Sequence, residues 1–179
     1  MPDVLTQDQR HRNMAAIHSA STNPEMKLRR ALWHQGFRYL KNDKRLPGRP
    51  DIVLPKYRTA VFVHGCFWHG HEGCKYYSVP LTNTEFWIAN VDRNQERDQV
   101  VWRQLEAKGW FVIIVWECQL KKAVFDDTVN RVAAEIVKNG SKYQSLQEER
   151  RLSRKKYLKE KRVQQKRRSI LMKEIKDKL

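Results

Sequence analysis

The chain has 179 residues and a formal net charge of +16 at pH 7, with a sequence pI of about 10.0. This length suits one domain with an appendage and is enough to bury a core. The sequence has no apolar run long enough to span a membrane and no secretory signal segment, so we expect a soluble cytoplasmic protein without a membrane partner. The positive charge favours a polyanionic partner such as nucleic acid.

The positive charge is concentrated towards the C-terminus. Residues 141–179 carry 15 Lys and Arg against 5 Asp and Glu, whereas residues 1–140 carry 21 against 15. We therefore divide the chain into a globular domain, residues 1–140, and a basic extension, residues 141–179. The extension lacks a regular apolar repeat, so it is either a charged helix or a disordered arm. Two roles stay open for it: a solvated segment without a specific function, or a phosphate-binding arm.

Helical and extended patterns alternate along the globular part. Capping residues, apolar spacing and Gly or Pro boundaries delimit seven segments. In chain order these are a helix over 22–36, strands over 37–42, 51–55 and 59–65, a helix over 82–109, a strand over 110–117, and a helix over 126–138 that ends at Asn139-Gly140. This order predicts an α/β fold with a mixed central sheet flanked by helices.

Cysteine and histidine gather in the stretch VHGCFWHGHEGC, residues 63–74. The chain has three cysteines, an odd number that argues against a disulfide framework. With one histidine they form a donor set that can close a tetrahedral zinc site: Cys66, His71, Cys74 and Cys118. Four protein ligands leave no open position for a substrate, so this zinc would be structural. The alternative for Cys118 is a small buried apolar residue.

Three residues outside this set suggest a second metal site. Asp51 begins one predicted strand and His64 ends the next, so pairing of the two strands would bring both to one edge of the sheet. A carboxylate there, with a histidine nearby, fits a divalent cation that holds a phosphate while an imidazole of His64 or His69 takes a proton from water. Taken alone, Asp51 is better explained as a turn or cap residue after Pro50, and the two histidines fit supporting or polar core positions equally well.

Five motifs together resemble the Vsr very-short-patch repair endonucleases. In family order they are LPGRPDIV, VFVHGCFWHGH-x2-C, TEFW, N-x-ERD and GW-x-V-x-IVWEC, between about residues 8 and 122. The family has a restriction-endonuclease-like core, contains zinc, requires Mg²⁺ and nicks DNA beside a T:G mismatch. The resemblance therefore implies double-stranded DNA with a T:G mismatch as substrate, other mismatch-repair proteins as further partners, and a monomer.

The resemblance also implies roles for individual residues. It assigns five to the active site: Glu25, Asp51, His64, His69 and Asp98. Asp51 and the backbone carbonyl of Val63 would bind Mg²⁺, and His69 would be the general base. His64 and Asp98 would support the water shell of the metal. For Glu25, its capping-box spacing from Thr22 offers a purely structural alternative.

The family inserts an aromatic wedge into the DNA stack. Phe67, Trp68 and Trp87 match the part that enters from the major groove, and Met14 would reach the stack from the minor groove. A wobble pair stacks poorly, so opening the step costs less there than at a matched pair, and an inserted aromatic restores about 1–3 kcal/mol of stacking. Without the resemblance, ordinary core packing explains the Phe67-Trp68 pair.

Three functions are compatible with these motifs. The first is an endonuclease that nicks at T:G mismatches and starts very short patch repair of deaminated 5-methylcytosine. The second is a sequence-specific nickase of the same fold, linked to a restriction-modification or mobile-element system. The third is a zinc-stabilised DNA-binding module without catalysis, which would have no need of Asp51, His64 and His69 together. The sequence thus favours an enzyme, and the substrate separates the first two functions.

Overall fold

The computed structural model describes residues 9, 12 and 21–176, with side chains through residue 166. Its helices and strands are, in order, α2 (Asn23–His34), β1 (Leu40–Lys41), β2 (Ile52–Leu54), β3 (Thr59–His64), α3 (Thr84–Ala107), β4 (Phe111–Trp116) and α4 (Phe125–Lys176). Short 3-10 turns are η1 (Pro55–Tyr57), η2 (Glu117–Leu120) and η3 (Lys122–Val124). The predicted mixed α/β architecture is confirmed. Among the described residues, no helix is long and apolar enough to cross a membrane.

The four strands form one mixed sheet in the order β1-β2-β3-β4. β1, β2 and β3 pair antiparallel through short connections. β3 and β4 pair parallel, from Thr59 opposite Phe111 to His64 opposite Trp116. A parallel pair requires a long crossover, which the loop after β3 and helix α3 provide. β3 is therefore central, and both of its long edges are paired.

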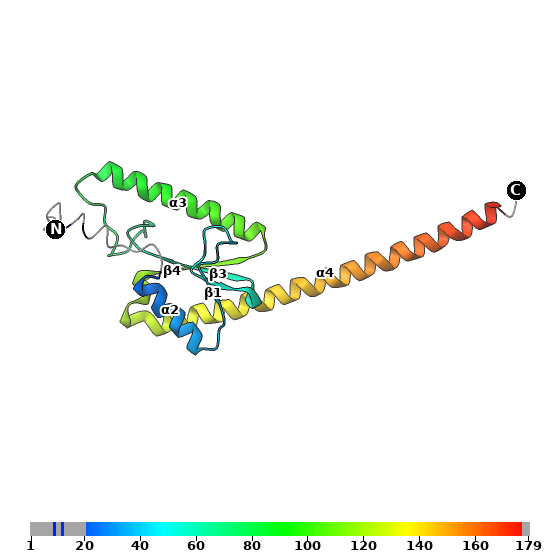
Figure 1. Cartoon of the computed structure of the whole chain (residues 1–179), viewed down its shortest axis with the longest axis horizontal. Coiled ribbons are helices and arrows are strands. Elements are labelled where there is room, and N and C mark those ends of the chain that lie inside the picture. Colours follow the sequence, from blue (N-terminus) through cyan, green and yellow to red (C-terminus); the bar gives the residue numbers. More distant parts are fainter. Residues whose placement is uncertain (1–8, 10–11, 13–20, 177–179) are drawn as a thin grey trace.

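Helices cover both faces of the sheet (Figure 1). Alternate side chains of a strand point to opposite faces, which divides the core in two. On one face, residues such as Ile52 and Val61 pack with Leu28 of α2 and Ile136 of α4. On the other face, residues such as Phe62 pack with the α3 side of the core, which includes Leu105, Trp110 and Val101.

The structure differs from the prediction at Asn139-Gly140. The helix does not end there: α4 continues without a break to Lys176 and projects beyond the sheet (Figure 1). Glycine at 140 serves packing, because a Cβ added there would lie 2.6 Å from Cδ1 of Tyr57. The lost helix propensity, about 1 kcal/mol relative to alanine, is therefore accepted for the close approach of a ring. Of the two alternatives for the extension, the structure has the helix.

Both helix starts also differ from the predicted ones. Thr22 does precede α2, but its hydroxyl donates to Glu25 Oε1 at 2.9 Å and caps no backbone group. α3 starts at Thr84, two residues later than predicted, after Asn83 in the left-handed region with φ of 54°. Asparagine tolerates that conformation better than most residues. Glu25 thus contacts the Thr22 side chain and also lies in the first turn of α2.

Candidate active site and metal centre

The parallel pairing of β3 and β4 brings the candidate residues to one edge of the sheet. β3 ends at His64, directly opposite Trp116 at the end of β4. The loop with the remaining histidines and two cysteines begins immediately after His64, and Cys118 follows Trp116 in η2. Residues more than 40 positions apart in the sequence are therefore neighbours in space.

His64, His69 and Asp98 form a compact cluster, in which one ligand atom of each residue lies within 4.8 Å of the others. The two imidazole rings stack, with centroids 3.7 Å apart and planes inclined by 14°. Nδ1 of His69 donates a hydrogen bond to Asp98 Oδ2, and His64 Nε2 lies 3.9 Å from the same oxygen. Asp98 is buried on α3. The strand, the loop and α3 thus each contribute one residue.

The charges of this cluster are set by burial and by neighbours. Burial, and next the charge of His69, lower the pKa of His64 to about 3, so the ring is neutral at physiological pH. Burial of Asp98 opposes its ionisation, but the hydrogen bond and charge of His69 lower its pKa overall. His64 Nδ1 is buried without a hydrogen-bond partner among the described residues. Such an orphaned atom is rare in native proteins and is typical of functional sites.

Asp51 lies beside this cluster and contacts the backbone of β3. Its Oδ2 accepts a hydrogen bond from the Val63 N–H at 2.8 Å, so the two residues are in contact. Burial raises the pKa of Asp51 to about 6, against the opposing effect of the Val63 hydrogen bond. The neighbouring Glu25 carboxylate raises the pKa further. A carboxylate that is costly to ionise here gains from a bound cation.

A buried ion pair on α2 contacts the backbone of Asp51, and the sequence motifs did not predict it. Arg29 and Glu25 are only 2% and 4% exposed, and the Arg29 guanidinium lies 3.1 Å from Glu25 Oε2. The same guanidinium donates to the backbone carbonyl of Asp51 at 2.9 Å and 3.2 Å. The Glu25-Arg29 spacing of four residues, on the helix face of Leu28 and Leu32, was the available signal.

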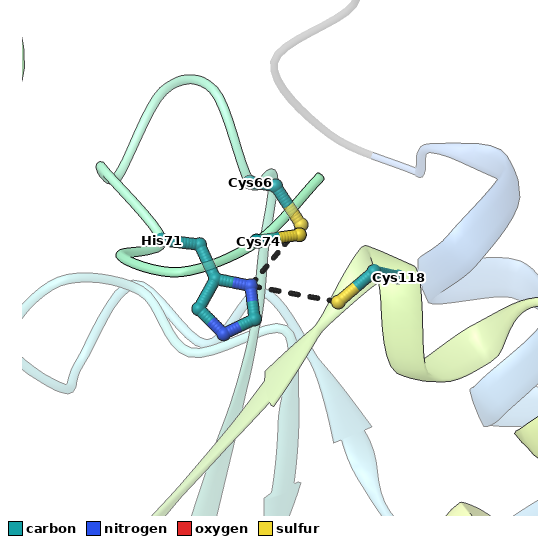
Figure 2. A group of neighbouring side chains, drawn as sticks. All are labelled: Cys66, His71, Cys74 and Cys118. Carbon is teal, nitrogen blue, oxygen red and sulfur yellow. Dashed lines mark hydrogen bonds between the residues drawn. The ribbon is translucent and has the colours of Figure 1, made fainter. Parts of the chain in front are cut away.

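Figure 2 shows the four predicted zinc ligands converging. Cys66, His71 and Cys74 come from the loop after β3, and Cys118 comes from η2. Their ligand atoms all lie within 4.8 Å of one another. His71 Nδ1 is 3.4 Å from the sulfur of Cys66 and 3.5 Å from that of Cys118. Zinc bond lengths of 2.3 Å to sulfur and 2.0 Å to nitrogen give tetrahedral edges of about 3.5 Å between S and N, so the donors fit that ion.

Trp116 lies between the two clusters, and no role was predicted for it. Its ring stacks on His71 with a centroid distance of 4.0 Å and an interplanar angle of 1°. Its ring also contacts His64 edge-on at 5.4 Å. One aromatic side chain thus packs against a candidate zinc ligand and a candidate catalytic histidine. Its position two residues before Cys118 was the only sequence signal.

Helix α3 holds the loop that contains these residues. Asn94 donates to the carbonyl of Trp68 at 2.9 Å, and Gln95 donates to those of His69 and Gly70, both at 3.2 Å. Gly70 has φ of 61°, and a Cβ there would lie 2.5 Å from the Gln95 side chain. Only glycine fits this close approach in the left-handed region. The backbone of the loop is therefore fixed directly against α3.

The predicted aromatic wedge residues also cluster. Ring centroids of Phe67 and Trp68, and of Phe67 and Trp87, are 5.2 Å apart, and all three side chains are partly exposed. Phe86, which the sequence analysis passed over, is 60% exposed and packs on Trp87 at 5.2 Å. Aromatic rings at the surface beside the His64-His69-Asp98 cluster exceed what core packing requires. Met14 lies outside the described residues.

Comparison with known proteins identifies the family. Residues 2–76 match the family DNA mismatch endonuclease Vsr. Over 137 residues the chain is 50% identical to the type II nicking enzyme V.NmeAIP of Neisseria meningitidis serogroup A, covering 76% of this chain and 97% of that protein. It is 45% identical to the DNA mismatch endonuclease Vsr of Escherichia coli K12, covering 68% and 77%. This chain belongs to the Vsr family.

Membership in the Vsr family makes the chain a DNA endonuclease, as the motifs predicted. The type II nicking enzyme V.XorIIP of Xanthomonas oryzae pv. oryzae is 42% identical, with 67% of this chain and 88% of that protein covered. Among solved structures, the catalytic domain of the homing endonuclease I-Bth0305I gives a TM-score of 0.43 at 17% identity, over 66% of this chain and 98% of that one. That score lies below the level that indicates a shared fold.

Replacing Arg29 with methionine should destabilise this Vsr-family protein by about 3–5 kcal/mol, because Glu25 would keep a buried charge without its partner. The free energy of unfolding from urea denaturation measures the effect. Arg131→Met is the matched control, since Arg131 pairs with Glu135 at the same spacing but with both side chains more than 40% exposed. We expect less than about 1 kcal/mol there. Equal losses in the two variants would contradict the buried ion pair.

Proposed function

We propose that this Vsr-family endonuclease nicks one DNA strand beside a T:G mismatch and thereby starts very short patch repair of deaminated 5-methylcytosine. The observation that carries the proposal is the juxtaposition of the His64-His69-Asp98 cluster with a partly exposed aromatic cluster. The first group suits phosphodiester hydrolysis and the second suits entry into a base stack. We assign this activity to residues 1–140, with a restriction-endonuclease-like core, and treat residues 141–179 as a separate extension.

Two oxygen donors near the cluster fit magnesium, which prefers carboxylate and carbonyl ligands. Asp51 would supply a carboxylate and Val63 its backbone carbonyl. The contact between the Val63 N–H and Asp51 Oδ2 supports this assignment, because it places the two backbone segments side by side. When bound, Mg²⁺ would offset the negative charge that develops on the scissile phosphate.

His69 is our candidate general base. Its Nδ1 is engaged with Asp98, which leaves Nε2 as the nitrogen that can accept a proton from water. The carboxylate of Asp98 would stabilise the imidazolium that forms and hold the ring in orientation. His64, neutral and stacked on His69, would support the water shell at the metal. The water oxygen would bond to phosphorus as His69 takes its proton, the bond to the 3′ oxygen would break, and that oxygen would take a proton from solvent, which gives a 5′-phosphate and a 3′-hydroxyl.

The ring pair Phe67 and Trp68, together with Trp87, is our candidate for mismatch selection. Opening a base step costs a few kcal/mol, and the cost is lower where the pair already stacks poorly. Partial exposure leaves these rings available to a base stack, and packing against one another limits the side-chain entropy lost on insertion. We extend the predicted wedge to include Phe86, the most exposed ring of the group. Met14 remains a proposed contact from the minor-groove side.

The substrate is tested by strand nicking with Mg²⁺ on labelled duplexes that carry T:G mismatches in varied flanking sequence. We expect cleavage of the T strand only, in a subset of contexts, and none of the matched T:A and C:G duplexes. Nicking of matched DNA at a defined sequence would instead favour the sequence-specific nickase, the second candidate. The two functions must be distinguished because two of the relatives are named type II nicking enzymes.

Asp51→Ala should lower the nicking rate by at least about 100-fold, because the carboxylate that would hold Mg²⁺ is removed. Single-turnover nicking at saturating enzyme measures the rate, and fluorescence anisotropy checks that DNA binding persists. Asp43→Ala is the control: Asp43 pairs with Arg45 in the same connection between β1 and β2 but lies outside the cluster, so nicking should be unchanged. A residual rate near the wild type in Asp51→Ala would overturn the metal assignment.

Cys118→Ala should lose the zinc and much of the thermal stability, because it removes the ligand that ties η2 to the loop after β3. Metal analysis after dialysis and a thermal melt report the two effects. His34→Ala, an exposed histidine in the last turn of α2, is the control and should keep one zinc per chain. One bound zinc and an unchanged melting temperature in Cys118→Ala would sink the ligand assignment.

A further inference from the structure

Beyond the core, α4 forms a free-standing segment that we call the C-terminal arm, residues 144–176. Contacts with the core come just before it: Gly140 packs against Tyr57, Lys142 lies over the Phe111 ring, and Tyr143 lies beside the Arg58 guanidinium. Every residue from 144 to 166 is exposed, so this part of the arm is not buried in the core. At a rise of 1.5 Å per residue the arm is about 50 Å long. Figure 1 shows it extending away from the sheet.

The arm carries a row of basic side chains on one side, which we call the basic stripe: Lys155, Lys159, Arg162 and Lys166. Their spacing of four, three and four residues places them on one helix face. Leu158 and Val163 lie beside them on the same part of the helix. None of the four has an ion-pair partner among the described side chains, whereas Arg151 pairs with Glu148 at 3.4 Å. Glu160 falls on another face of the helix.

We propose that the C-terminal arm is a second DNA-binding surface, which holds the phosphate backbone through the basic stripe. Unpaired lysine and arginine on a solvated helix are complementary to a polyanion, and release of counterions from DNA drives the contact. Phosphate contacts of this kind fix position and carry no base specificity. The proposal rests on the action of the Vsr family on DNA and is independent of the mismatch proposal.

The position of the arm determines which DNA it can touch. α4 passes η1, at the start of β3, before it leaves the core, whereas His64 lies at the opposite end of β3. The stripe therefore meets DNA away from the nicking site. The arm length of about 50 Å corresponds to about 15 base pairs at 3.4 Å each. Only a duplex that extends well beyond the catalytic cluster can reach the stripe, so the arm adds affinity on long DNA without moving the cleavage position.

The test compares two full-length variants with equal loss of charge. The stripe variant replaces Lys155, Lys159, Arg162 and Lys166 with glutamine, a good helix former. The control variant makes the same change at four basic residues that lie outside the stripe: Arg150, Arg154, Lys156 and Lys161. Circular dichroism confirms equal helix content. Binding is measured by fluorescence anisotropy in EDTA, across a salt series, on matched duplexes of about 12 and 40 base pairs.

On the long duplex the stripe variant should bind at least about tenfold more weakly, and its slope of log affinity against log salt should fall by about 3 to 4. The control variant should change that slope by about 1 or less, and all three proteins should bind the short duplex alike. An unchanged slope in the stripe variant would overturn the proposal. Equal losses in both variants would overturn the assignment to one face.

Two further measurements distinguish this proposal from self-association of the arm and from the mismatch proposal. Sedimentation of the wild type without DNA tests pairing of two arms: a dimer that persists in the stripe variant, with DNA binding unchanged, would replace our proposal by self-association. Nicking of the short T:G duplex tests the proposed function separately. If the protein fails to nick that duplex but keeps the length-dependent salt slope, the mismatch proposal is wrong and the proposal for the arm stands.

Discussion

The parallel pairing of β3 with β4 is the constraint on which the rest of the structure depends. It places His64 and Trp116 side by side at the ends of the two paired strands. Side chains alternate along a strand, so a slip of one residue in this register would turn His64 to the opposite face and shift Cys118 relative to the loop. The apolar side chains of β3, nearly all buried, fix the register, and the chemistry at its end follows from that packing.

Both clusters take residues from the loop after β3, so a change in that loop affects both. Cys66 and His71 belong to the candidate zinc set, His69 lies between them in sequence, and Trp116 packs against both clusters. An ion that binds four donors here does more than close a loop, because it also limits where His69 can point. Small changes at the thiol cluster would thus reach the His64-His69-Asp98 cluster through a few rigid contacts.

Sequence patterns predicted the segments that depend on local signals, and failed where tertiary contacts decide. Helix α2 and the strands follow from periodicity and from Pro and Gly boundaries, and the four convergent donors around Cys118 follow from ligand chemistry. Arg29 went unnoticed because a charged residue on an amphipathic helix is normally exposed, and only the folded chain shows that it is buried against Asp51. Gly140 was read as a helix end because the ring of Tyr57, 83 residues earlier, cannot be inferred from local sequence.

The continuity of α4 has a mechanical consequence. A flexible linker would let the distal part of the chain sample a broad volume, whereas an unbroken helix behaves as a semi-rigid spacer with a fixed direction relative to the sheet. Close packing of Tyr57 at Gly140 leaves no hinge at that junction. The chain is therefore sensitive to the path of whatever polymer lies in its active site: a trajectory that follows the helix axis comes within reach of its far end, and one that curves away does not.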